Sequence, residues 1–251
     1  FLPGGKEQIA GEYQPGWMLL SYGKKVSVSS SLEGYPAENI VDEDARTAWV
    51  AQSNRDMEWA QVDLQRLSSI HAIQVNFDEY GANQKGAVSG VYQSYLIYAS
   101  VNGEDWSLVV DYGTKKTDTP HDYIEFEEPF KARYIKLQNK EYMVSENFSV
   151  RDLRIFGKGQ GSTPRAVNDF TVERDEADPC KARLCWEAVP DAQGYIVRYG
   201  IAGDKLYNNF QVMGENTLEI GSLNKGVAYY FTIDAYNENG ITRTSRIKVC
   251  R

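Results

Sequence analysis

The chain has 251 residues, of which 42% are hydrophobic and 25% charged, an ordinary composition for a globular protein of about two domains. The net charge is −8 and neither half carries a basic stripe, which argues against nucleic-acid binding. No apolar run approaches the roughly 18 residues of a membrane span, and an acidic surface repels anionic lipid headgroups.

The first 21 residues contain Gly4-Gly5 and Pro15-Gly16 but little periodicity, so we interpret residues 1–21 as a lead-in from an upstream module. This N-terminus has no signal-peptide pattern. Residues 16–30 then alternate between apolar and polar side chains, which predicts a first strand.

An acidic turn, a polar loop and an alternating strand follow in residues 37–64. The turn, Asp42-Glu43-Asp44, closes on Thr47 and places several oxygen atoms close together. Calcium favours such a set, because it takes roughly 6–8 oxygen ligands. A solvated acidic turn with a capping threonine explains the same residues equally well. The strand over 59–64 has a period of two and therefore one buried face.

Further short alternating segments predict an all-β chain. Asn102-Gly103 is a strong hairpin signal, and no long segment shows helical periodicity. Short strands separated by turn signals every 8–12 residues or so favour a β-sandwich. The strands of this first module are expected over 70–77, 95–100, 106–110, 123–126, 134–137 and 150–156.

The stretch over 158–165 is rich in Gly, Ser and Pro, and we predict that it is a flexible linker. Two modules are thus expected, at 22–157 and 166–251. The second has strands expected over 170–172, 182–188, 194–200, 218–220, 228–237 and 241–249.

No catalytic motif is present. The two histidines, His71 and His121, have no metal-ligand spacing, and neither a nucleophile elbow nor a phosphate loop occurs. A pair of glycosidase carboxylates cannot be recognised from sequence. We expect a chain that is not an enzyme by itself.

The motifs of the first module resemble a known family. The segment 37–64 reads A-E-N-x-V-D-x-D-x-x-T-x-W, followed by E-W-x-x-V-D-L, and the strands Ala132–Leu137 and Asp152–Gly157 also fit the pattern. These residues resemble the discoidin domain, also called factor V/VIII type C, and its sugar-binding branch, carbohydrate-binding module family 32. The resemblance implies an eight-stranded antiparallel β-sandwich.

The same resemblance implies two sites. A structural calcium ion would be bound by Asp42, Asp44, Thr47 and, in place of the family's usual glutamate, Asp152. Sugar would bind where the loops 52–58, 78–86 and 141–148 meet, although the loop aromatics could instead pack beneath their own loops. Trp49 and Trp59 are expected in the core. The sugar-binding residues implied are Asn54, Arg55, Tyr80, Asn83, Tyr142, Asn147 and Phe148.

The second module resembles a fibronectin type III domain, through W-x-x-V-x-x-A-x-G-Y-x-V-x-Y from Trp186 and the pattern from Leu223 to Gly240. This implies an immunoglobulin-like β-sandwich. The three cysteines all lie in this module, and an odd number leaves at least one without an intramolecular partner. The resemblance places Cys180 and Cys250 at one pole, so we predict a disulfide between them in an oxidising compartment.

The two resemblances together predict a non-catalytic, carbohydrate-binding accessory region. Its expected context is a secreted, periplasmic or cell-surface bacterial glycoside hydrolase, perhaps of family 43, with an upstream catalytic domain. We expect a monomer that binds carbohydrate but no nucleic acid, and that does not insert into membranes. The alternative is an architectural or protein-adhesion pair without a sugar site.

Overall fold

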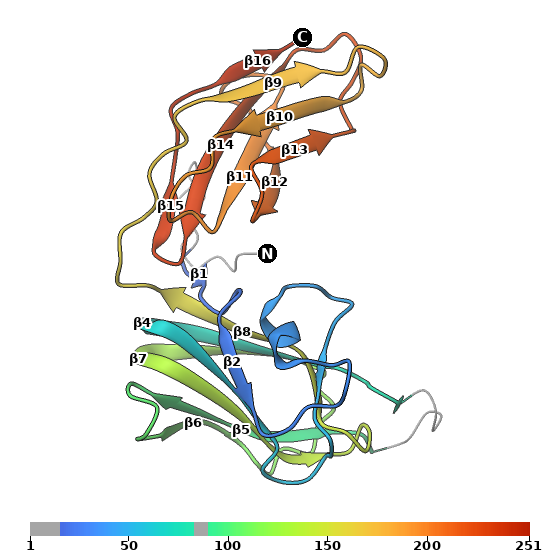
Figure 1. The fold of residues 1–251 in the computed structure, drawn as a ribbon, viewed down its shortest axis with the longest axis vertical. Helices are drawn as coiled ribbons and strands as arrows, with labels where there is room; N and C mark the ends of the chain where they lie inside the picture. The colour runs from blue at the N-terminus through green and yellow to red at the C-terminus, as the bar shows by residue number, and fades with distance from the viewer. Residues whose placement is uncertain (1–15, 83–89) are drawn as a thin grey trace. The chain divides into compact units, whose positions relative to one another are not determined.

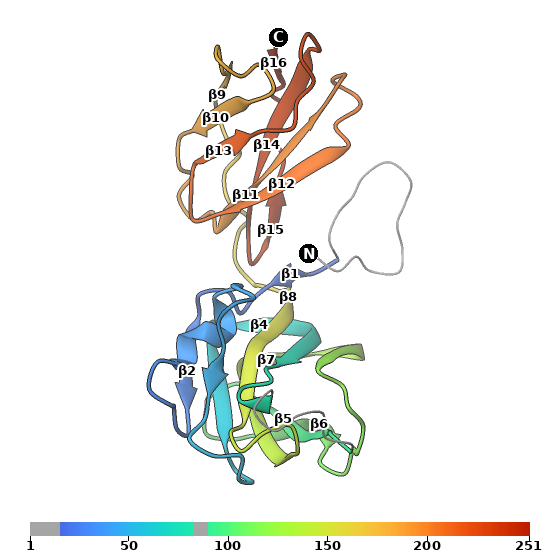
Figure 2. The ribbon, with the colours of Figure 1, turned by 90° about the vertical axis from the view of Figure 1, so that its right-hand side faces the viewer.

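A computed structural model describes residues 16–82 and 90–251 and divides the chain into two compact units, Phe1–Gln160 and Gly161–Arg251. The division falls inside the Gly/Ser/Pro-rich segment 158–165. Both units are built from β-strands, as the alternating patterns predict (Figures 1 and 2). One short 3-10 helix, η1 (Ala37–Val41), interrupts them in the described part of the first unit. No helix among the described residues is long and apolar enough to cross a membrane.

The described residues of the first unit form an antiparallel sheet of eight strands in the order β1-β8-β4-β7-β5-β6, with β2 paired to β4 and β3 paired to β8. The eight-stranded all-β prediction is therefore confirmed. The strands are β1 (Met18–Leu19), β2 (Lys25–Val28), β3 (Trp49–Val50), β4 (Trp59–Phe77), β5 (Gln93–Ser100), β6 (Ser107–Tyr112), β7 (His121–Tyr142) and β8 (Ser149–Lys158).

Strands β4 and β7 are long enough to take part in both layers of the sandwich. The first part of β4 lies between β2 and β7, and its second part lies between β8 and β7. The pairing is irregular between Asp63 and Ser68, where Gln65 has a positive φ of 66°. The prediction of separate strands at 59–64 and 70–77 is thus wrong, because both segments belong to β4. The prediction of separate strands at 123–126 and 134–137 is wrong for the same reason, because both belong to β7.

The core forms because alternate residues of these strands point inward. Val62, Ile73, Val75, Ile135 and Leu137 are all fully buried. An aromatic cluster closes one end, where Phe148 packs edge-on against Trp49 and Tyr142 at ring-centroid distances of 5.8 and 5.3 Å. Edge-to-face pairs of this kind are a favoured geometry for buried aromatic rings.

The second unit consists of a three-stranded sheet, β13-β10-β9, and a five-stranded sheet, β12-β11-β14-β15 with β16 paired to β14. Its core is built around Trp186, Leu184, Val197 and Phe231. The strands are β9 (Phe170–Arg174), β10 (Ala182–Trp186), β11 (Gly194–Gly200), β12 (Asn208–Met213), β13 (Thr217–Ile220), β14 (Tyr229–Asn237), β15 (Gly240–Thr242) and β16 (Lys248–Cys250).

The three cysteines, all within the described residues, are free thiols, so the predicted Cys180–Cys250 disulfide is not formed in this structure. Cys180 is exposed in the turn before β10, whereas Cys250 is buried in the core. Cys185 is half-buried between inward-facing Leu184 and Trp186, because successive residues of a strand face opposite sides.

Candidate functional site

Two of the three predicted sugar-binding loops are tied together by asparagine side chains. The amide nitrogen of Asn54 donates hydrogen bonds to the carbonyls of Tyr142, at 3.2 Å, and Ser145, at 2.8 Å. In return, the amide nitrogen of Asn147 donates to the carbonyl of Ala51 at 2.8 Å. The loops 52–58 and 141–148 therefore lie side by side.

The third loop joins them at its beginning. The carbonyl of Asp78 accepts hydrogen bonds from the hydroxyls of Tyr142 and Ser149. Two residues on, half-buried Tyr80 packs edge-on against Tyr35, with ring centroids 4.9 Å apart. Asn83, the other predicted ligand in this loop, lies outside the described residues. The end of the module thus gathers these three loops and the segment that carries Tyr35.

Tyr142 and Phe148 cannot offer a ring face to a sugar, and their prediction as sugar-binding residues is wrong. Each is only 1% exposed, and both pack against Phe77 in the aromatic cluster. Burial raises the pKa of the Tyr142 hydroxyl. Their place in the loop sequence suggested exposure, but their role is to support the loops from below.

Several polar groups at this end have no partner within the described part of the chain. Arg55 is exposed, and its guanidinium makes no hydrogen bond or ion pair with a carboxylate or carbonyl there. The side-chain carbonyl oxygens of Asn54 and Asn147 accept no hydrogen bond from residues 16–82 or 90–251, because only their amide nitrogens hold the loops. These donors and acceptors are available to ligand hydroxyls.

Glu58 fixes the shape of the loop 52–58. Its carboxylate accepts hydrogen bonds from the hydroxyls of Ser30, at 2.8 Å, and Ser53, at 2.6 Å, and from that of Ser29. Burial disfavours the ionised carboxylate, but the three hydroxyls outweigh it, so the pKa of Glu58 lies below its ordinary value. The ionised form therefore joins this loop to the segment 29–31.

Two methionines project from the same loops. Met57 is 62% exposed and Met143 is 50% exposed. The lysines close to these positions are paired with acids, Lys140 with Asp56 at 2.6 Å and Lys116 with Glu141. The described parts of these loops thus expose two apolar side chains, and Arg55 is the one basic side chain there without an acidic partner.

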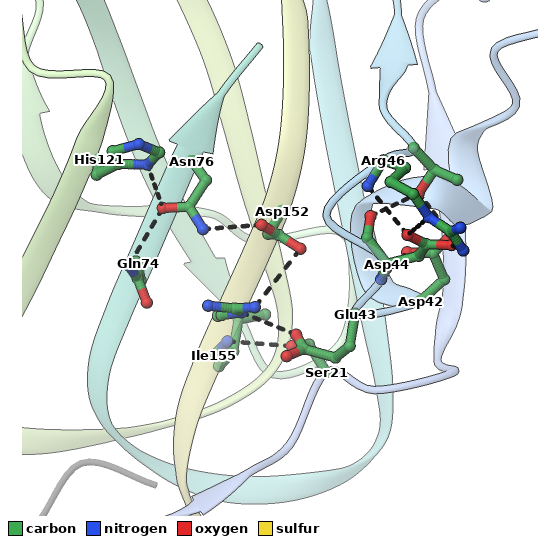
Figure 3. A network of polar contacts seen from close by, with 12 residues as sticks. Ser21, Asp42, Glu43, Asp44, Arg46, Gln74, Asn76, His121, Asp152 and Ile155 are labelled. Carbon is green, nitrogen blue, oxygen red and sulfur yellow. Dashed lines mark hydrogen bonds and ion pairs between the residues drawn. The ribbon is translucent and has the colours of Figure 1, made fainter. Parts of the chain in front are cut away.

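The predicted calcium turn is formed, and its oxygen atoms already have partners (Figure 3). The two carboxylate oxygens of Asp42 accept from the amide of Asp44 and the hydroxyl of Thr47, both at 2.8 Å. Asp44 is paired with exposed Arg46 at 2.8 Å, and this hydrogen bond lowers the pKa of Asp44 to about 2. Two carboxylates and a hydroxyl on one tight turn suit a hard cation in their chemistry.

Asp152 does not join that turn, so the prediction that it completes the ligand set is wrong. It is 3% exposed, and its Oδ2 accepts from the amide nitrogen of Asn76 at 2.8 Å. Arg154 lies between the two parts of the predicted site, with its guanidinium 3.9 Å from Asp152 Oδ1 and 2.9 Å from the carboxylate of Glu43. Within the described ranges, no cluster of three or more His, Cys, Asp or Glu side chains could hold a metal ion.

The histidines make structural contacts. The ring of His71 stacks on Trp17 at 5.3 Å, and His121 Nδ1 lies 3.1 Å from the side-chain carbonyl of Asn76. Asn76 in turn donates to Asp152, so His121 belongs to a row of polar side chains across β7, β4 and β8. His71 Nε2 also lies 3.5 Å from the hydroxyl of Ser69.

The sequence patterns misplaced Trp59 and did not identify Tyr35, both of which lie near the site. Trp49 is fully buried, as predicted, but Trp59 is only half-buried and lies on the opposite side of β4 from inward-facing Ala60. The alternation over 59–64 already carried this signal. Tyr35, which packs on Tyr80, lies in a segment with no pattern that marks it.

Comparison with known proteins gives partial matches. Rat lactadherin is 33% identical over 110 residues and mouse lactadherin 32% over 110, covering 41% of this chain in each case. The chain spans about a quarter of the length of these relatives, 25% and 23%.

Solved structures of similar fold have low identity. A chitosan-binding module from a chitosanase/glucanase of Paenibacillus sp. IK-5 is 20% identical, with a TM-score of 0.47, and the match covers 56% of this chain and 99% of that one. The family 32 module of Clostridium perfringens NanJ, solved with galactose, is 18% identical, with a TM-score of 0.45. That match covers 56% of this chain and 98% of the NanJ module.

One further match, to a protein family, covers the candidate site. The F5/8 type C domain matches residues 25–152, which include the acidic turn, the three loops and Asp152. Through this domain, the chain belongs to the F5/8 type C family.

Proposed function

We propose that the first unit is a non-catalytic carbohydrate-binding module whose ligand sits on the loop end. The observation that carries this proposal is the convergence of the loops 52–58, 78–82 and 141–148 around Arg55, Tyr80 and two asparagine carbonyl oxygens. Sugars need polar groups aimed at hydroxyls and an apolar ring face, and these residues supply both.

The proposed site is shallow. Its two fully buried aromatics lie beneath the loops, which leaves Tyr80 and the exposed Met57 and Met143 as apolar surface. Little surface would be buried, and the hydroxyls of a free sugar are already well solvated. We expect dissociation constants from tens of micromolar to millimolar, roughly 4–6 kcal/mol.

We also propose that the acidic turn binds a structural calcium ion through Asp42, Asp44 and Thr47, with Asp152 not a ligand. An ion at this turn would compete with Arg46 for Asp44. Because the turn forms only in the folded chain, a bound ion would stabilise the folded first unit by mass action.

For the second unit we propose a fibronectin type III-like spacer. In support, its sheets have three and five antiparallel strands, and Trp186 packs edge-on against Tyr195 in the core. The hydroxyl of Tyr229, the first residue of β14, accepts from the amide of Asn224, 3.3 Å away, as in the tyrosine corner of such sandwiches. We propose a secreted bacterial glycoside hydrolase as the host, of the family 43 type, from the order of the modules alone.

The exposed methionines favour a second candidate, binding to a lipid surface, because apolar loop tips are one of the two features that such binding needs. Among the described residues of these loops, the other feature, free basic neighbours, is supplied by Arg55 alone, since Lys116 and Lys140 are paired with acids. If neither glycans nor anionic vesicles bind, the architectural or adhesion role remains.

A glycan array probed with the full chain tests the proposal. We expect binding to short or terminal sugars, reduced by Arg55→Ala and by Tyr80→Ala. Lys131→Gln, an exposed change on β7, serves as the control. The proposal fails if no glycan binds at millimolar concentration, or if both loop variants bind like the parent.

A further inference from the structure

The sheet formed by β2, the first part of β4, the last part of β7, β5 and β6 has an outer face that the loop site does not use. Inward-facing residues such as Val62 and Ile135 alternate along these strands with outward-facing ones. Cross-strand pairing aligns Gln61, Lys136 and Tyr98 in one row, and Asp63, Tyr134 and Ser100 in the next. Trp59 and Gln138 form the adjacent row.

Aromatic rings gather on this outer face around a lysine. The ammonium group of Lys136 lies 4.1 Å from the ring centroid of Trp106 and 5.4 Å from that of Tyr98. Trp106, from the loop after β5, also packs against Tyr134 with ring centroids 6.5 Å apart. The four aromatic residues, Trp59, Tyr98, Trp106 and Tyr134, are each half-buried, unlike the core aromatics.

Two lysines lie on this face, exposed Lys25 in the row of Asp63 and half-buried Lys136 among the rings. Arg133 forms a bidentate pair with Asp63, at 2.8 and 2.9 Å, so those charges offset each other. Lys136 has no carboxylate partner among the described residues, only the two rings. Burial beside the rings lowers the pKa of Lys136. Cation–π contacts compensate in part for lost hydration, but they leave the positive charge itself unneutralised.

We propose that this face is a second ligand site, separate from the loop end, which binds an acidic polysaccharide through one uronic acid residue at a time. The aromatic rings would stack on the C–H faces of the sugar, and the ammonium of Lys136 would pair with the carboxylate. Gln61 lies next to Lys136 on β4 and can meet ring hydroxyls.

The charge pattern selects this ligand. Nucleic acid would need several cations along its backbone, whereas of the two lysines on this face, Lys25 and Lys136, only Lys136 lies against the rings, in a protein of net charge −8. A neutral sugar would leave the half-buried ammonium without a partner. A uronate brings a single carboxylate on a ring that has apolar faces, so it matches both features at once.

The test uses the full chain and a defined probe, a trimer of galacturonic acid, with the neutral galactose trimer for comparison. We expect the acidic trimer to bind and to weaken with added salt. Lys136→Gln should weaken its binding at least tenfold, and Lys136→Arg should retain most of it. Lys131→Gln, on the same strand, is the matched control.

Two further variants keep the two sites distinguishable. Tyr98→Ala should weaken binding of the acidic trimer, whereas Arg55→Ala, at the loop end, should not. Unchanged melting temperatures would show that the variants remain folded. The proposal is overturned if the acidic trimer does not bind the parent, if Lys136→Gln binds like the parent, or if Arg55→Ala abolishes binding. None of these results tests the loop-end site, because binding there is measured separately with neutral sugars.

Discussion

At the scale of single residues, the same side chain can hold the scaffold and still leave a group for a ligand. Asn54 and Asn147 use their amide nitrogens to tie neighbouring loops together. Because the fold fixes these amides, their carbonyl oxygens are held in place before a ligand arrives. Preorganisation of this kind reduces the entropy lost on binding.

Substitution of loop aromatics should separate support from recognition. Phe148→Ala removes a side chain that is 1% exposed, and we expect a loss of roughly 3–5 kcal/mol in the free energy of unfolding. Tyr80→Ala, at a half-buried position, should leave the melting temperature nearly unchanged and weaken sugar binding about tenfold, about 1.4 kcal/mol. Thermal melts and ligand titrations distinguish these effects. Equal melting temperatures for both variants would contradict the assignment.

Glu58 predicts how the loop end responds to acid. Its pKa is lowered in the folded protein, so ionised Glu58 stabilises the fold above the unfolded-state pKa of about 4.3, and this stability is lost as the pH falls through the lower folded value. Glu58→Gln should therefore destabilise the first unit near pH 7 and flatten its pH dependence below about pH 4. Urea unfolding at several pH values measures this. Glu104→Gln, in an exposed turn, is the control, and a parent-like profile for Glu58→Gln would be contrary evidence.

Sequence reasoning succeeded for residues where alternation decides the face, and failed where a loop folds over a core. Val75 was placed correctly because its neighbours alternate in polarity, whereas the burial of Trp49 was expected from the family resemblance. Tyr142 and Phe148 border polar loops, and only the contact with Phe77, from another strand, shows that they are buried. The position of Asp152 likewise depended on Arg154, whose place between Glu43 and Asp152 no local pattern reveals.

At the scale of elements, β4 and β7 position both candidate sites. Both strands contribute to the two layers of the sandwich. Strand β4 begins directly after the loop 52–58 and ends directly before the loop that starts at Asp78. Sequence periodicity detected the segments but divided each strand in two. The irregularity near Gln65 shifts the pairing without ending the strand, and periodicity cannot distinguish these cases.

The acidic turn gives a prediction for the element that carries it. If calcium binds there, it stabilises the folded first unit by mass action, so chelation should lower the melting temperature of that unit alone. Asp42→Ala should reproduce the effect of the chelator and abolish any further response to it. Asp152→Asn should retain the response, since Asp152 lies with Asn76 and Arg154 instead. Identical melting curves with and without chelator would contradict an exchangeable calcium ion.

At the scale of the whole molecule, two compact units predict two independent folding transitions. The division after Gln160 lies within the segment 158–165. Limited proteolysis should cut in that segment first and release fragments that each melt cooperatively. Mass spectrometry locates the cut, and calorimetry of the purified fragments tests their stability. First cleavage within β4 or β7, or an unfolded fragment, would be inconsistent with two autonomous units.

Calorimetric titration of the full chain with the best neutral glycan from an array measures whether the loop end binds carbohydrate. We expect a dissociation constant between tens of micromolar and a few millimolar, raised about tenfold in Arg55→Ala, about 1.4 kcal/mol, and unchanged in Lys131→Gln. If folded Arg55→Ala binds the glycan with the same dissociation constant as the parent, the loop end is not the carbohydrate site.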